Sequence, residues 1–266
     1  MAADLAGLLG DLAAETVVLD GLLAGLGAAR WPTPTPSPGW SVHDQVTHLA
    51  YFDETAALAA ADPGRFRAEA ATLGAGFPDE IARRYRAMPP AGALGWFRTA
   101  RAGYLATFRG LDPRQRLPWY GPGMSAASSV TARLMETWAH GQDVADTLGV
   151  TRPPSARLRH VAHLGVSTFR FTFLLNARAV PDAPVRVELT APGDGRWAWG
   201  PADAANRVTG PALDFCLAVT QRRHLDDLAL EITGPVAAAW MPIAQAFAGP
   251  PGHGRKPGMA VPGGTQ

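Results

Sequence analysis

The chain has 266 residues, of which 47% are hydrophobic and 18% are charged, a balance typical of a folded protein. Its formal net charge is +1 and it contains no basic run, so nucleic-acid binding has no electrostatic support. The single cysteine, Cys216, excludes an internal disulfide and a metal cluster built on cysteines. The sequence contains neither an apolar run of roughly 18 residues, as a membrane span needs, nor a basic N-terminal segment typical of a signal peptide. We therefore expect a cytoplasmic protein, a monomer or homodimer, whose partner is a small molecule.

The first predicted helix is followed by a stiff connection. Residues 4–26 carry leucines at helical spacing, which predicts one long helix with a wide apolar face. In residues 30–40, four prolines at alternate positions exclude a helix and favour an extended segment. Such a segment is either a rigid loop or a wall beside a pocket, and in the second case Trp31 and Trp40 are its candidate lining residues.

The second predicted helix begins at a capping motif. Ser41 is a typical N-cap residue, and Asp44, three positions later, completes a variant of the capping box. The helix that follows carries His48 within its apolar stripe. An isolated histidine in such a stripe is usually a core residue, but His48 is also a candidate metal ligand if partners lie on another helix. Asp44 lies one turn before His48, so we expect it to orient the ring of His48 as a hydrogen-bond acceptor.

The middle of the chain alternates between helices and loops. Residues 61–78 are expected to hold a short helix and a loop, and a third helix that begins near Pro78 is interrupted at the prolines 89 and 90 before it resumes. A long irregular segment, 111–129, comes next and is rich in aromatic residues and glycine. It is either a packed loop or a substrate-binding loop. In the second case the residues that contact the substrate are Trp119, Tyr120 and Met124.

The fourth predicted helix covers roughly residues 126–148 and carries three residues able to act at a metal ion. Glu136 and His140 are four residues apart, so their side chains lie on one face of the helix, about one turn apart. A carboxylate and an imidazole placed in this way can hold one divalent cation, but two ligands are too few for a stable site. Asp143 follows on the same face and is expected to orient His140 rather than to bind the metal.

The second half of the sequence is predicted to mix helices and strands. Residues 155–177 read as a helix, and two strands near 184–192 and 196–201 are joined by Pro192-Gly-Asp-Gly195, a hairpin signal. A third short strand is expected at 206–210. It is followed by a helix with Pro211 in its first turn, a strand at 227–233 and a final helix at 236–247.

These elements predict a mainly α protein with two domains. An all-α first part, 1–152, is consistent with a four-helix bundle, an architecture that commonly holds metal sites in its core. A helix within 153–178 is expected to connect it to a small α+β domain at 179–250. The Gly/Pro-rich residues 251–266 are expected to form a flexible tail.

Two motifs resemble those of a known family. The segment Trp40-Ser-Val-His-Asp-Gln-Val-Thr-His48-Leu and the segment Glu136-x-x-x-His140-x-x-Asp143 resemble the DinB-like (YfiT-like) metal-binding bundles. The closer resemblance is to their subgroup, the mycothiol-dependent maleylpyruvate isomerases, which add a small α+β domain. It covers roughly residues 1–250 of this chain. It implies that His48, Glu136 and His140 bind a divalent metal ion, usually zinc, with further coordination positions open to water or a thiol.

The resemblance also implies a role for one arginine of the second domain. Thr220-Gln-Arg222-Arg-His-Leu-Asp226 resembles the segment in which these isomerases carry a functional arginine. It implies that Arg222 binds an anionic group of the substrate, such as a carboxylate. On the residues alone, Arg222 is instead a solvated charge near a helix C-terminus.

Three functions follow from these patterns. The leading hypothesis is a metal-dependent enzyme that uses a low-molecular-weight thiol of the mycothiol type for isomerisation or S-transfer on a small substrate. The second is a hydrolase, lyase or cyclase that uses a metal-bound water and no thiol. The third is a non-catalytic protein that binds a small molecule and holds a structural metal, which a fourth protein ligand such as Asp143 would favour.

Overall fold

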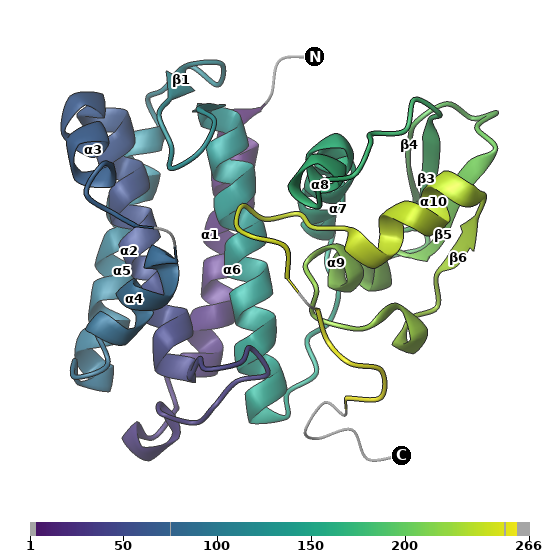
Figure 1. Cartoon of the computed structure of the whole chain (residues 1–266). Helices are drawn as coiled ribbons and strands as arrows, with labels where there is room; N and C mark the ends of the chain where they lie inside the picture. Colours follow the sequence, from purple (N-terminus) through teal and green to yellow (C-terminus); the bar gives the residue numbers. More distant parts are fainter. Residues whose placement is uncertain (1–3, 75, 253, 260–266) are drawn as a thin grey trace. The chain divides into compact units, whose positions relative to one another are not determined.

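The computed structural model describes residues 4–74, 76–252 and 254–259 (Figure 1). These residues form two compact units, and the chain passes from the first to the second after Thr151. Within these described ranges, none of the helices combines the length and the apolar character that crossing a lipid bilayer requires.

Four long helices build the first unit, as predicted. α2 packs against α5 and α6, while α1 packs against the same two helices, so each helix contacts two others. Buried Leu19, Val46, Leu49 and Phe97 belong to the apolar core among them. Burial of these side chains supplies most of the stabilisation of such a bundle, because helix propensity alone contributes little. The four helices are α1 (Leu5–Leu23), α2 (Val42–Ala61), α5 (Pro90–Phe108) and α6 (Ala126–Leu148).

The helices that carry the candidate metal ligands begin and end where the sequence predicts. The Ser41 side chain accepts a hydrogen bond from the Asp44 N–H, and the Asp44 carboxylate accepts one from the Ser41 N–H, which completes the capping box of α2. α6 begins after Ser125, whose hydroxyl caps it, and ends at Gly149. Gly149 has a φ of 70°, a left-handed conformation that glycine adopts without steric cost. These caps define where the two helices that carry His48, Glu136 and His140 begin and end.

Shorter elements join the long helices. The predicted interruption before α5 is present, because α4 ends at Arg84 and Pro90 occupies the first turn of α5. The segment that precedes α6 forms a two-stranded antiparallel ribbon, in which Leu117 pairs with Met124. These elements are η1 (Ala28–Arg30), α3 (Pro63–Ala70), α4 (Phe77–Arg84), β1 (Arg116–Leu117) and β2 (Met124–Ser125).

The second unit contains a four-stranded sheet with strand order β4-β3-β5-β6. β3 and β4 form the predicted antiparallel hairpin, whose turn places Gly193 and Asp194 at positive φ. β5 pairs in parallel with β3 and antiparallel with β6. The strands are β3 (Val185–Thr190), β4 (Arg196–Trp199), β5 (Asn206–Pro211) and β6 (Glu231–Thr233). The helices are α7 (Leu158–Ser167), α8 (Phe169–Leu175), α9 (Ala212–Val219), η2 (Leu225–Asp227), α10 (Pro235–Trp240) and η3 (Met241–Ile243).

The second unit differs from the prediction in two of its helical segments. The segment expected to connect the domains as one helix forms two helices, α7 and α8, which belong to the second unit, and α7 packs against α9. The final helix is shorter than predicted, because Pro242 lacks the N–H that would continue α10 past Trp240. Part of the expected flexible tail, 253 and 260–266, lies outside the described residues. In the described part, the Gly258 N–H donates to the Asp227 carboxylate at 3.0 Å.

Candidate metal centre

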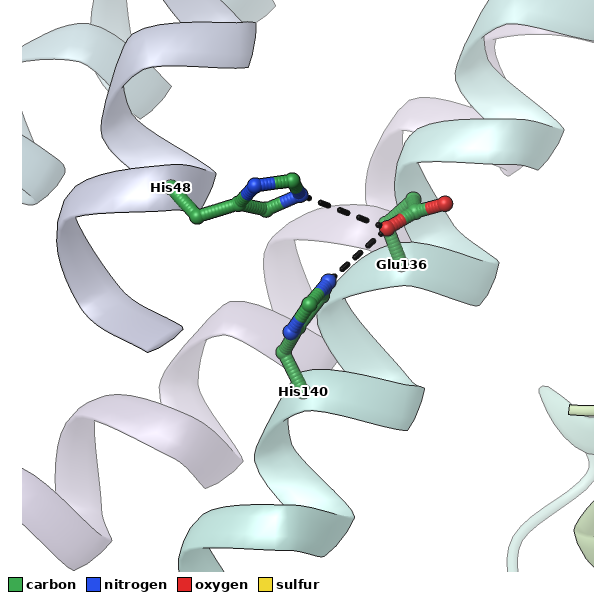
Figure 2. A group of neighbouring side chains, drawn as sticks. All are labelled: His48, Glu136 and His140. Atoms are coloured by element: carbon green, nitrogen blue, oxygen red, sulfur yellow. Dashed lines mark hydrogen bonds and ion pairs between the residues drawn. The ribbon is translucent and has the colours of Figure 1, made fainter. Parts of the chain in front are cut away.

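Three side chains from two helices converge inside the bundle (Figure 2). His48 projects from α2, and Glu136 and His140 project from α6. One potential ligand atom from each residue lies within 4.8 Å of the others. Glu136 Oε2 is 2.9 Å from His140 Nε2 and 3.7 Å from His48 Nε2. Two imidazole nitrogens and one carboxylate oxygen form a donor set that suits zinc and related divalent ions.

Burial controls the charge of these side chains. Burial lowers the pKa of His48 to about 4, and the nearby His140 adds to this effect. Burial alone would raise the pKa of Glu136, but hydrogen bonds with His140 and His48 hold that pKa well below its usual value. At neutral pH the carboxylate of Glu136 is therefore ionised and His48 is neutral, the states in which both side chains bind metal ions.

A chain of hydrogen bonds orients His140. The Thr35 hydroxyl donates to the Trp40 carbonyl at 2.9 Å, so its oxygen is left to accept from the Gln45 amide nitrogen, also at 2.9 Å. The Gln45 side chain must then present its oxygen to His140 Nδ1. This arrangement places a proton on Nδ1, so Nε2 is the nitrogen that can bind a cation, in place of its hydrogen bond with Glu136.

Aromatic rings flank the two histidines. The Trp40 ring stacks on His140, with centroids 5.8 Å apart, and meets the His48 ring edge-on at 5.1 Å. The Phe52 ring lies 4.5 Å from His48. Trp40 was one of the two tryptophans predicted to line a pocket. The other, Trp31, is buried in the bundle core and contacts His43.

The predicted roles of two aspartates need correction. Asp44 does not orient His48, because its carboxylate accepts hydrogen bonds from Ser41 and Arg86 instead. At the third position of a helix a carboxylate turns back toward the N-cap, away from the following turn. His48 Nδ1 has no hydrogen-bond partner among the described residues. Gln45 takes the place expected for Asp143, whose carboxylate accepts a hydrogen bond from the Ser37 hydroxyl at 2.9 Å.

A buried ion network, which the sequence analysis missed, lies on the same helices. Asp53 of α2 accepts from Arg133 Nε of α6 at 2.9 Å and from Arg101 Nε of α5 at 2.8 Å. Arg133 also donates to the Leu49 carbonyl at 3.2 Å, and Arg101 to the Thr137 hydroxyl at 2.9 Å. The network joins α2 to α6 one to two turns from the candidate ligands. Charged residues at positions where the helix pattern requires apolar ones are the sequence signal that marks it.

Of the three residues of the loop before α6 that were predicted to contact a substrate, two, Trp119 and Tyr120, lie in an aromatic cluster. The Trp119 and Tyr120 rings lie 6.1 and 5.7 Å from the ring of Phe52, which itself contacts His48. Met124 lies in β2 instead. Burial raises the pKa of the Tyr120 hydroxyl, which is therefore protonated at neutral pH.

Arg222 lies in the second unit, after α9. Its guanidinium donates to the Thr220 carbonyl at 2.7 Å, which folds the side chain back on its own segment. Its binding to an anionic group of a substrate stays a prediction.

Comparison with known proteins identifies the family. Residues 12–145 match the family model described as the mycothiol maleylpyruvate isomerase N-terminal domain, and residues 181–232 match one described as wyosine base formation. Uncharacterized proteins from two strains of Mycobacterium tuberculosis are each 49% identical to this chain over 248 residues, which cover 92% of this chain and 96% of the relative.

Solved structures support the same assignment at the level of fold. The crystal structure of the mycothiol-dependent maleylpyruvate isomerase matches with a TM-score of 0.62 at 15% identity, covering 86% of this chain and 93% of the isomerase. A mutant of that enzyme, with a histidine replaced by alanine, matches with a TM-score of 0.61 at 14% identity and the same coverage. The family match extends over half of the chain and includes all three candidate ligands. The chain therefore belongs to the family of proteins built on the mycothiol maleylpyruvate isomerase N-terminal domain, with its DinB-like bundle.

Proposed function

We propose that this protein is a metal-dependent enzyme that acts with a low-molecular-weight thiol of the mycothiol type, in isomerisation or S-transfer on a small substrate. His48, Glu136 and His140 would hold the divalent metal, most simply zinc. The observation that carries the proposal is the convergence of three suitable donor atoms within 4.8 Å inside the bundle. The names of the family model and of the solved structures, which both refer to mycothiol, support the choice of thiol.

The donor set fits a metal on chemical grounds. Burying a carboxylate costs several kcal/mol unless it meets a cation or hydrogen bonds. Glu136 faces two imidazole nitrogens, but the His48 ring is neutral and supplies no positive charge. A divalent cation would supply that charge. A bound divalent cation would lower the pKa of a coordinating thiol or water toward neutrality. Asp143 is not among the three converging donors within the described residues, so the set supports an open site more than a filled structural one.

The chain's own residues would prepare the site in three ways. Gln45 holds a proton on Nδ1 of His140, so that Nε2, which faces Glu136, is the nitrogen that would bind the metal. Trp40 and Phe52 cover the histidine rings and restrict the access of water to them. Arg222 is proposed to bind an anionic group of the substrate, and Tyr120, protonated at neutral pH, is a candidate proton donor.

Metal analysis of the purified chain tests the site. We expect about one zinc ion per wild-type chain after dialysis, the stoichiometry of a three-ligand site. His48→Ala and His140→Ala should each lose most of this metal, whereas His224→Ala, a partly exposed histidine paired with Asp226, should retain it. Full metal content in both ligand variants would show that the proposed site is wrong.

Turnover measurements test the thiol. Electrophilic unsaturated acids would be supplied to the zinc-loaded protein with and without mycothiol. We expect product formation to depend on the thiol and to disappear in His140→Ala. Equal rates without mycothiol would favour the alternative, a hydrolase, lyase or cyclase that uses bound water. Metal binding without turnover of any candidate would favour a binding protein.

A further inference from the structure

Five aromatic rings form a continuous cluster that reaches the candidate metal centre. We call this cluster the aromatic wall. Its members come from three helices and the loop before β2: Phe52 of α2, Phe66 of α3, Phe77 of α4, and Trp119 and Tyr120 of the loop.

The wall is connected to the metal centre through Phe52. The centroid of the Phe52 ring lies 4.5 Å from that of His48 and 5.8 Å from that of Phe77. Phe77 and Tyr120 are 4.6 Å apart, and Trp119 stacks on Phe66 with an interplanar angle of 6°. These separations fall in the range at which aromatic rings attract one another. Phe77, Trp119 and Tyr120 all contact Phe52, so a flat group bound on any of these three rings would lie two rings from His48.

The burial of the wall is uneven. Phe52 and Phe66 are buried, whereas Phe77, Trp119 and Tyr120 are each half-buried. The apolar cluster of the bundle core that contains Leu19, Val46 and Phe97 is formed by other residues. Three neighbouring aromatic side chains that keep part of their surface accessible are able to bind an apolar ligand. Trp40, also half-buried, contacts the rings of both histidines.

Resting on the proposed function, we infer that the aromatic wall binds a flat, unsaturated or aromatic part of the substrate, while the polar end of the same substrate faces His48, Glu136 and His140. The substrate class is thus a planar apolar group that carries a metal-binding head, such as a carboxylate or carbonyl. Stacking on each ring of the wall would strengthen binding roughly three- to tenfold.

Two hydroxamates with the same head test this inference. Benzohydroxamic acid and acetohydroxamic acid present the same metal-binding group and differ in that the first carries a phenyl ring. Their dissociation constants for the zinc-loaded full chain would be measured by calorimetry. We expect the phenyl compound to bind at least roughly tenfold more tightly to the wild type.

Variants of the wall separate stacking from general hydrophobic preference. In Trp119→Leu and Tyr120→Leu the ratio of the two dissociation constants should fall at least roughly threefold, because the side chain stays apolar but the ring is lost. Trp96→Leu is the matched control. Trp96 is also half-buried in the first unit, but its ring contacts Tyr85 and its indole nitrogen donates to Glu54. Thermal unfolding by circular dichroism would show that each variant is folded.

The outcomes distinguish this inference from the proposed function. A ratio that is the same in the wild type, both wall variants and Trp96→Leu would overturn the inference and leave the metal site intact. Failure of both hydroxamates to bind the wild type would overturn the metal site and the inference together. A ratio that falls in the wall variants alone would support both.

Discussion

Among the described residues, two of the polar groups inside the bundle lie on the same pair of helices, α2 and α6, and they differ in how completely their charges are paired. In the ion network both oxygens of Asp53 meet an arginine within 3 Å, and the arginine side chains are at most 4% exposed. In the candidate metal centre a single oxygen of Glu136 faces both histidines, and the Glu136 side chain is 23% exposed. A group whose charges are fully paired holds helices together, whereas a group with incompletely paired charges is a candidate for binding a ligand or a metal ion.

The largest expected effect comes from removing the carboxylate of the buried ion network. Asp53→Asn leaves Arg101 and Arg133 buried without their carboxylate, which should cost roughly 3–5 kcal/mol of unfolding free energy. Urea denaturation at pH 7 measures it. Asp20→Asn, which removes a solvent-exposed pair with Arg98, is the control and should cost far less. Similar losses in the two variants would contradict the distinction between buried and exposed pairs.

The second largest effect is the loss of stability on acidification, which we expect from the protonation of residues in the candidate metal centre. The pKa of His48 lies near 4 in the folded protein and at 6.5 in the unfolded chain, so the unfolded chain binds more protons between these values. Metal-free protein should therefore lose stability as pH falls from 6.5 to 4, by on the order of 3 kcal/mol from His48. The lowered pKa of Glu136 adds a loss of the same sign at lower pH.

Urea midpoints across this pH range measure the acid effect. The decrease of stability with falling pH should be smaller in His48→Gln, because glutamine cannot take up the proton. It should be unchanged in His224→Gln. A stability that rises on acidification would show that His48 is charged in the folded protein.

A smaller effect tests how Gln45 prepares the site. Gln45→Leu removes the acceptor at His140 Nδ1, and loss of such a partner typically lowers metal affinity 10–100-fold. Competition with a chromophoric zinc chelator measures the affinity. Gln142→Leu replaces another buried glutamine, which bonds Asp146 on the same helix, and should leave the affinity unchanged. Unaltered affinity in Gln45→Leu would assign the orientation of His140 to other residues.

The smallest effect concerns the cap of the helix that both groups share. Ser41→Ala removes the side-chain half of the capping box and should destabilise the protein by about 1 kcal/mol. Zinc affinity should stay within about twofold, because His48 lies almost two turns further along α2. A large loss of affinity would mean that the start of α2 positions His48 directly. Thermal unfolding and the chelator titration measure the two quantities on the same preparation.

The sequence was sufficient to predict features that depend on local chemistry. Ser41 with Asp44, and Gly149, mark helix ends because their side-chain and backbone preferences act within a few residues. The spacing of Glu136 and His140 predicts a shared helix face for the same reason. His48 was harder to assign, since a histidine in an apolar stripe has the same pattern whether it binds a metal or packs in the core.

Features that depend on tertiary contacts were not predictable in this way. The orientation of Gln45 follows from Thr35 and Trp40, which belong to an irregular segment whose path the sequence does not define. The Asp53 network joins three helices, and no local spacing relates Arg101 to Asp53. The error at Asp44 has a different cause. Its spacing to His48 permits a contact within one helix turn, but the carboxylate bonds to Ser41 at the N-cap and to Arg86 instead.

The position of Trp40 gives the protein an internal optical reporter. Its indole stacks on His140, meets His48 edge-on and donates through Nε1 to Asp79. A change in the charge or occupancy of either imidazole therefore changes the surroundings of a fluorophore that is already in place. The difference in emission between the wild type and Trp40→Phe isolates this signal from the other seven tryptophans of the chain. Arrival of a ligand at the centre can thus be followed in real time without a label.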